Sequence, residues 1–230
     1  MSGWRSRLLA GLILASAGSA HAYPLDGASD TGIQRLEAAR LTQAGELPGR
    51  RLPIGALWQT SQVRLRLADR TDFTRPPADP AVSRSLRQML GAEASRYGIA
   101  VLDVSDPEDP LYAEHRGDAV FNPGSVGKLI VALGVFQALA DLYPDDVDAR
   151  RRVLSETTVV ADDFILAPSH EVPFWSPGSA RVVRRKIRVG DEANLWSFLD
   201  WTLSASSNSA ASTVIQQLLL LRHFGLHYPA

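Results

Sequence analysis

The sequence has no cysteine and only two lysines, Lys128 and Lys186, among its 230 residues. Without cysteine the chain can form no disulfide, no thiolate nucleophile and no cysteine-ligated zinc site. The other basic residues are 22 arginines (24 − 2). Because an arginine keeps its proton in a protein, whereas a desolvated lysine can lose it, the position of each lysine is informative.

The sequence also lacks an excess of positive charge. Its formal net charge is −1, and it becomes −3 (22 − 25) when the first 22 residues, with their two arginines, are set aside. No basic field therefore exists to attract nucleic acid. The five histidines show no metal-binding spacing, and His170 and Glu171 are adjacent, so they would not share a helix face. We expect no nucleic-acid partner, no metal site and no cofactor.

The N-terminus has the pattern of an export signal. Arg5 and Arg7 precede an apolar run over residues 8–17, and Ala20-His21-Ala22 matches a signal-peptidase site. The apolar run is shorter than the roughly 20 residues that a membrane span needs. The sequence predicts a signal peptide over residues 1–22 that is cleaved after Ala22. We expect a secreted, periplasmic protein without a stable membrane anchor.

The remaining chain divides into an N-terminal extension and linker over residues 23–79 and a main domain over residues 80–230. In the extension, the pattern predicts a helix over residues 33–44 and a strand through Val63, Leu65 and Leu67. Asp79 and Pro80 are suited to the cap and the first position of a helix that carries apolar residues from Val82 to Ala94.

The main domain alternates strands and helices. Strands are expected over residues 99–104 and 111–115, followed by a helix that opens at Ser125 and is apolar almost all round, as in a buried central helix. Further helices are expected over residues 146–154, after a cap at Asp191, and over residues 210–221. This order predicts an α+β fold with a sheet packed on an all-α region.

A basic run, residues 181–189, lies in an irregular stretch before the cap at Asp191. It predicts a solvated strand or hairpin. A patch that faces an anionic polymer is the alternative.

Chemistry is indicated at the start of the central helix. Lys128 follows Ser125 by three residues, which stacks the two side chains on one helix face. A serine beside an amine that can act as a base is an activated nucleophile. A helix N-terminus can also stabilise an oxyanion, and burial beside Leu129 and Ile130 would lower the pKa of the lysine, as a base requires.

A second polar motif, Ser206-Ser207-Asn208, lies between two apolar helices. Together with Ser125 and Lys128 it resembles the S-x-x-K and S-x-N motifs of the penicillin-recognising serine enzymes, which include class A β-lactamases and the penicillin-binding transpeptidases and carboxypeptidases. The resemblance covers residues 80–225 and implies the fold of that family, an antiparallel sheet packed on an all-α region. It implies that Ser125 forms an acyl-enzyme and that Lys128 is its general base or proton relay.

The same resemblance implies that Ser206 passes a proton to the leaving nitrogen. It also implies that Asn208 binds the substrate amide carbonyl and orients Lys128. Ser207 stands where class A enzymes have aspartate, which favours the broader S-x-N pattern. The family's third motif, K-T-G, would follow Asn208, but none of the 22 residues after it (230 − 208) is a lysine. We therefore expect a truncated domain with a sheet incomplete at its C-terminus, poor stability and little activity.

Two other nucleophile or phosphate motifs fail here. The α/β-hydrolase elbow needs glycine at Pro123, and a P-loop needs glycine at Asn122 and a hydroxyl at Leu129. The expected function is that of a secreted serine hydrolase that opens β-lactam amides through acyl-Ser125. Two alternatives stay open: a peptidoglycan D-Ala-D-Ala carboxypeptidase or transpeptidase, and a non-catalytic wall-binding module with the same fold. The expected partner is a small β-lactam or a peptidoglycan stem peptide.

Overall fold

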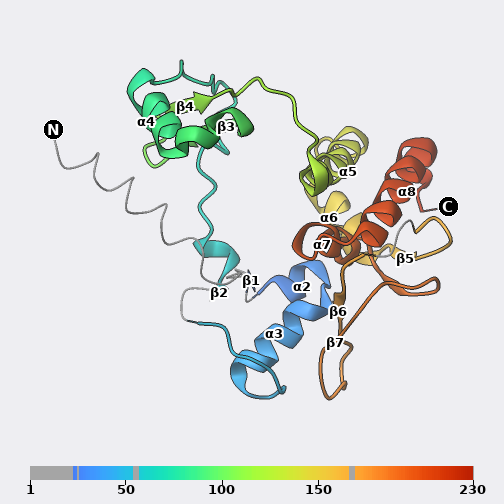
Figure 1. Ribbon diagram of the computed structural model, residues 1–230. Helices are drawn as coiled ribbons and strands as arrows, with labels where there is room; N and C mark the ends of the chain where they lie inside the picture. Colours follow the sequence, from blue (N-terminus) through green and yellow to red (C-terminus); the bar gives the residue numbers. More distant parts are fainter. Residues whose placement is uncertain (1–22, 25, 54–56, 166–168, 230) are drawn as a thin grey trace. The chain divides into compact units, whose positions relative to one another are not determined.

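A computed structural model describes residues 23–24, 26–53, 57–165 and 169–229 of the chain (Figure 1). The segment predicted as a signal peptide lies outside these residues. The chain forms two compact units: the first combines residues up to 62 with residues from 125 onward, and the second is residues 63–124. This division does not coincide with the boundary between residues 79 and 80 that the sequence suggested.

The second unit is a helix on a hairpin. Helix α4 (Pro80–Leu90) continues into a 3-10 helix (Gly91–Arg96) and packs on β4 (Leu111–His115), which pairs antiparallel with β3 (Ile99–Asp103). The predicted cap is confirmed, because the Asp79 carboxylate accepts hydrogen bonds from the backbone N–H groups of Ala81 and Val82, both at 2.8 Å. The two strands confirm the hairpin expected from the sequence.

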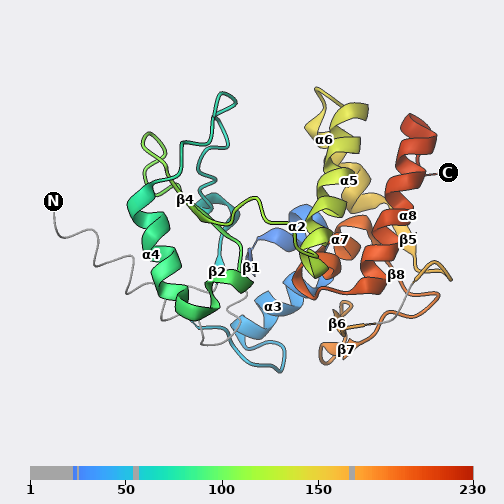
Figure 2. The same cartoon turned by 45° about the horizontal axis from the view of Figure 1, so that its top comes forward.

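The first unit is built on four helices: α5 (Lys128–Leu142), α6 (Val147–Glu156), α7 (Leu195–Ser204) and α8 (Asn208–Phe224). Figure 2 shows α5, α7 and α8 grouped together, and α8 packs on both α5 and α7. Gly134 allows α5 to approach α8 closely, since a Cβ atom there would lie 2.9 Å from Leu218 Cδ2. The core of this unit includes Val135, Leu139, Phe198 and Val214.

Helix α5 is buried on one face only. Its buried residues are Ala132, Val135, Ala138 and Leu139. On the opposite face Leu129, Ile130 and Leu133 are 58%, 69% and 59% exposed. The prediction of a buried central helix is therefore wrong for this exposed face, because α7 and α8 pack on α5 on the side of Ala132, Val135, Ala138 and Leu139. By length and composition alone the segment Gly124–Leu142 could also cross a membrane, a property that core helices share.

The strands of the first unit form short pairs. In the first unit β5 (Thr158–Val160) pairs antiparallel with β8 (Glu192–Asn194), and β6 (Val172–Phe174) pairs antiparallel with β7 (Val183–Arg185). A parallel pair joins β1 (Tyr23–Pro24) and β2 (Leu57–Trp58). The fold is therefore mixed α+β, as expected, but its strands form separate two-stranded pairs.

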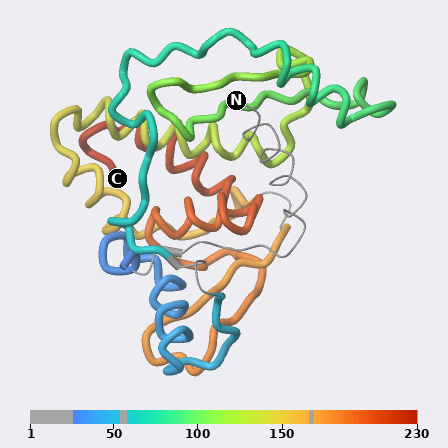
Figure 3. Tube along the Cα trace, turned by 90° about the vertical axis from the view of Figure 1, so that its left-hand side faces the viewer, coloured from blue at the N-terminus to red at the C-terminus, as the bar shows by residue number. Residues whose placement is uncertain are grey.

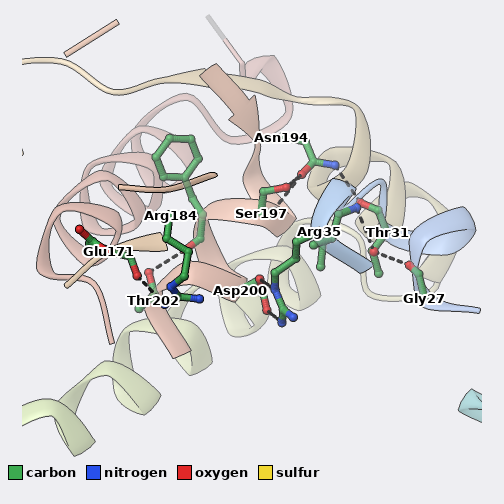
Figure 4. A network of polar contacts seen from close by, with 11 residues as sticks. Gly27, Thr31, Arg35, Glu171, Arg184, Asn194, Ser197, Asp200 and Thr202 are labelled. Carbon is green, nitrogen blue, oxygen red and sulfur yellow. Dashed lines mark hydrogen bonds and ion pairs between the residues drawn. The ribbon is translucent and has the colours of Figure 1, made fainter. Parts of the chain in front are cut away.

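The N-terminal segment of the first unit is tied to α7. It carries α2 (Gly27–Thr31) and α3 (Gln34–Ala44), and α3 ends at Gly45, whose φ of 84° needs glycine's freedom. Figure 4 shows Arg35 of α3 in an ion pair with Asp200 of α7, with the two side chains 10% and 11% exposed. Figure 3 shows α3 beside the β6–β7 segment. Residues 26–53 are thus part of the unit that carries α5 and α8.

Asn194 makes a second tie in the same network. Its Nδ2 donates to the carbonyl oxygens of Thr31, at 2.8 Å, and Ser155, at 3.0 Å, while its Oδ1 caps α7 by accepting from the N–H of Ser197 at 2.9 Å (Figure 4). The prediction that Asp191 caps this helix is wrong. The Asp191 carboxylate instead forms an ion pair with Arg185.

One predicted strand is not formed. Residues 63–67 are irregular and largely exposed, and Leu65 is 74% exposed. The alternation of apolar and polar residues there is real, but a strand also needs a partner for its backbone groups.

Candidate functional site

Ser125 lies in a 3-10 turn, Gly124–Gly127, directly before α5. The turn is entered through Gly124, whose φ of 51° is in the left-handed region and whose N–H donates to Asn122 Oδ1 at 2.9 Å. The side chain of Ser125 is exposed. The sequence placed Ser125 at a helix N-terminus, and the structure places it one tight turn ahead of the α-helix. The first N–H groups of such a turn have no partner within it.

The second motif lies at the junction of α7 and α8, and its middle residue anchors it. Ser207 is fully buried, its N–H donates to the Trp201 carbonyl at 3.1 Å, and its Oγ caps α8 by accepting from the Ala210 N–H at 3.3 Å. Ser206, with a φ of 55°, and Asn208 flank this anchor. Burial of the central serine therefore leaves the two flanking polar side chains directed away from the core.

Lys128 joins the two motifs. Its Nζ lies 3.1 Å from Ser125 Oγ, 3.1 Å from Ser206 Oγ, 2.8 Å from the Ser206 carbonyl oxygen and 2.8 Å from Asn208 Oδ1. The other three residues singled out from the sequence, Ser125, Ser206 and Asn208, are thus all within hydrogen-bond distance of this one amine. Together with Lys128 they come from two places in the chain, the start of α5 and the junction of α7 and α8, and all lie in the first unit.

The contacts match a neutral amine as well as an ammonium. The two closest neighbours, the Ser206 carbonyl and Asn208 Oδ1, can only accept hydrogen bonds, so they suit the two N–H groups of a neutral amine. The two hydroxyls, at 3.1 Å, can donate, so either can place its proton on the remaining lone pair. An ammonium has three N–H groups for these four oxygens.

The surroundings of Lys128 also favour the loss of its proton. Burial lowers the pKa of Lys128 below its usual value, because the charged form loses hydration. Among the described residues, Lys128 forms no ion pair with a carboxylate that would hold its proton. The environment therefore supports a lysine that can accept a proton from a neighbouring hydroxyl.

Ser169 is a neighbour of the site that the sequence did not indicate. Its Oγ accepts a hydrogen bond from the Asn208 N–H at 3.3 Å and lies 3.0 Å from His170 Nδ1. Ser169 precedes Asn208 by 39 residues in an irregular stretch, so no local spacing connects them. Among the described residues no group of three or more acidic or histidine side chains could hold a metal ion.

Comparison with known proteins found no matching family model, no matching curated protein and no matching solved structure.

Proposed function

We propose that the chain is a serine acyl-transfer hydrolase of the β-lactamase and penicillin-binding type, with Ser125 as nucleophile. The observation that carries the proposal is the position of Lys128 Nζ, which is within 3.1 Å of both Ser125 Oγ and Ser206 Oγ. An amine with a lowered pKa beside an exposed serine hydroxyl is what nucleophilic catalysis at neutral pH requires.

The acylation step follows from these contacts. Neutral Lys128 takes the proton of Ser125 as its Oγ attacks the carbonyl carbon of an amide, and the oxyanion accepts a hydrogen bond from the Ser125 N–H. The C–N bond then breaks, and Ser206 Oγ gives its proton to the leaving nitrogen while it regains one from Lys128. Asn208 holds the amine through its Oδ1. Water later cleaves the ester and releases the acid.

The first test is covalent labelling with a fluorescent penicillin. The wild-type chain should form a covalent adduct whose mass equals protein plus penicillin, and peptide mapping should find it on Ser125. Ser125→Ala should abolish labelling. Ser179→Ala, which removes an exposed hydroxyl elsewhere in the same unit, should label like the wild type. Wild-type labelling at another residue, or equal labelling of both variants, would refute the assignment of the nucleophile.

Substrate class is a separate measurement. We propose β-lactams, which predicts slow turnover of a chromogenic cephalosporin after acylation, in line with the little activity expected without the third motif. Release of D-alanine from an acyl-D-Ala-D-Ala peptide without cephalosporin turnover would instead identify a peptidoglycan peptidase. A chain that is folded by circular dichroism and forms no adduct with either substrate would identify a non-catalytic binding module.

A further inference from the structure

The β6–β7 hairpin carries a concentration of positive charge that the acyl-transfer site does not use. Residues 172–190 contain five basic residues and no aspartate or glutamate, in a chain whose formal net charge is −1. Figure 1 shows this hairpin beside α3. The positive charge is therefore concentrated in this hairpin, because the chain as a whole has no excess of basic residues.

The side chains along β7 and the following residues alternate in exposure. Ile187 is 2% exposed and belongs to the core, and Arg185 is half-buried. Arg185 is already engaged, since it forms a bidentate ion pair with Asp191 and stacks its guanidinium 3.7 Å from the centre of the Phe174 ring. These inward contacts fix the orientation of the segment.

The intervening residues, Arg184, Lys186 and Arg188, are all exposed. We call these three residues the basic row. None of them forms an ion pair with a carboxylate among the described residues, and the Arg184 guanidinium donates to the backbone carbonyl of Glu171, at 3.0 Å. In an extended segment, alternate side chains follow one another at about 7 Å. The row thus presents three cations in a line on one side of the chain.

From this placement we propose that the basic row binds a linear polymer that carries phosphate groups. The row is narrow and follows one segment of chain, with Arg184 in β7 and Lys186 and Arg188 directly after it, so it fits a chain of anions better than a flat surface. Two of its three members are arginines, whose planar guanidinium groups bind phosphate oxygens in pairs. The neighbouring Asp191 forms its ion pair with Arg185, and its carboxylate also accepts a hydrogen bond from the Arg188 backbone N–H at 2.7 Å, so it offsets part of the charge at that end of the row.

The test measures binding of long-chain inorganic polyphosphate to the intact protein by fluorescence anisotropy. The triple variant Arg184→Gln, Lys186→Gln, Arg188→Gln should weaken binding by about tenfold or more, and three phosphate contacts predict a slope of roughly −2 for log K against log salt. The control variant Arg64→Gln, Arg84→Gln, Arg87→Gln removes the same charge from exposed positions in the other unit and should bind like the wild type.

Two further arms identify the ligand. A single-stranded phosphodiester oligomer of equal charge shows whether the phosphate chain alone is recognised, and vesicles with anionic phospholipid test a membrane surface. Equal weakening of both triple variants, absence of polyphosphate binding by the wild type, or binding to vesicles only would overturn the proposal. Should the triple variant not fold, the single charge reversal Lys186→Glu at an exposed position provides the same comparison.

Discussion

Ser206 combines two properties that can be separated by substitution. Its φ of 55° is unfavourable for a residue with a Cβ atom, by roughly 1–2 kcal/mol, while its Oγ and carbonyl oxygen both contact Lys128. Ser206→Gly should relieve the backbone strain and raise the free energy of unfolding by up to about 1 kcal/mol. It should nevertheless lose acylation, because the proton-relay hydroxyl is absent. Urea denaturation and penicillin labelling measure the two effects.

Ser206→Ala is the matched variant, since it also lacks the hydroxyl but keeps the strain. It should label as poorly as the glycine variant without the gain in stability. If either variant labels at the wild-type rate, Ser206 Oγ has no part in acylation.

The lowered pKa of Lys128 leads us to expect a specific pH dependence of the labelling rate. Burial lowers the pKa of Lys128, so the labelling rate should rise with pH and then level off. The midpoint of this rise should lie below the usual pKa of lysine. Stability should depend on pH in the same direction. Between the lowered pKa of Lys128 in the folded chain and the usual lysine pKa, the unfolded chain binds more protons than the folded one, so the free energy of unfolding rises with pH. This contribution is lost as the pH falls through the folded pKa.

Lys128→Arg keeps the charge but cannot supply a neutral amine, so labelling should be lost at every pH. Labelling that persists in this variant would make Lys128 an electrostatic residue and not a base.

At the scale of elements, the ion pair of Arg35 and Asp200 should hold α3 against α7. Both side chains are about nine-tenths buried, so removal of one partner leaves a buried charge unpaired. Arg35→Met should therefore lower the free energy of unfolding by about 3–5 kcal/mol, and the double variant Arg35→Met, Asp200→Leu should lose less than the sum of the single changes.

The matched control is Arg40→Met on the same helix. Arg40 pairs with Glu37 at an exposed i,i+3 position, so its loss should cost less than about 1 kcal/mol. Additive single effects at Arg35 and Asp200 in urea denaturation would show that the two charges are not coupled in solution.

Helix ends could be predicted from the sequence because their causes are local. The predicted cap at Asp79 depends only on residues within one turn and is formed, and the same kind of local contact lets Asp146 cap α6 and the left-handed Gly45 end α3. Asp191 illustrates the opposite case: its local position suggested a cap, but Arg185 engages its carboxylate, and Asn194 caps α7. The spacing of Ser125 and Lys128 was likewise local, whereas the contact of Ser169 with Asn208 depends on the tertiary fold.

At the scale of the whole molecule, the sequence shows how apolar α5 is but not which of its faces is covered. Hydropathy counts side chains, and burial depends on the elements that pack on each face. Ala132, Val135, Ala138 and Leu139 face the core, while Leu129, Ile130 and Leu133 are exposed. An exposed apolar surface of this kind promotes association.

The double variant Ile130→Gln, Leu133→Gln tests this arrangement. Both side chains are more than half exposed, so their replacement should change the free energy of unfolding by no more than about 0.5 kcal/mol. It should also reduce binding of a hydrophobic dye and weaken any concentration-dependent association in sedimentation velocity. Ala132→Gln, at a buried position on the opposite face of α5, is the control and should destabilise the chain by about 1–3 kcal/mol through overpacking. A double variant destabilised as strongly as this control would show that the Ile130 and Leu133 face is covered in solution.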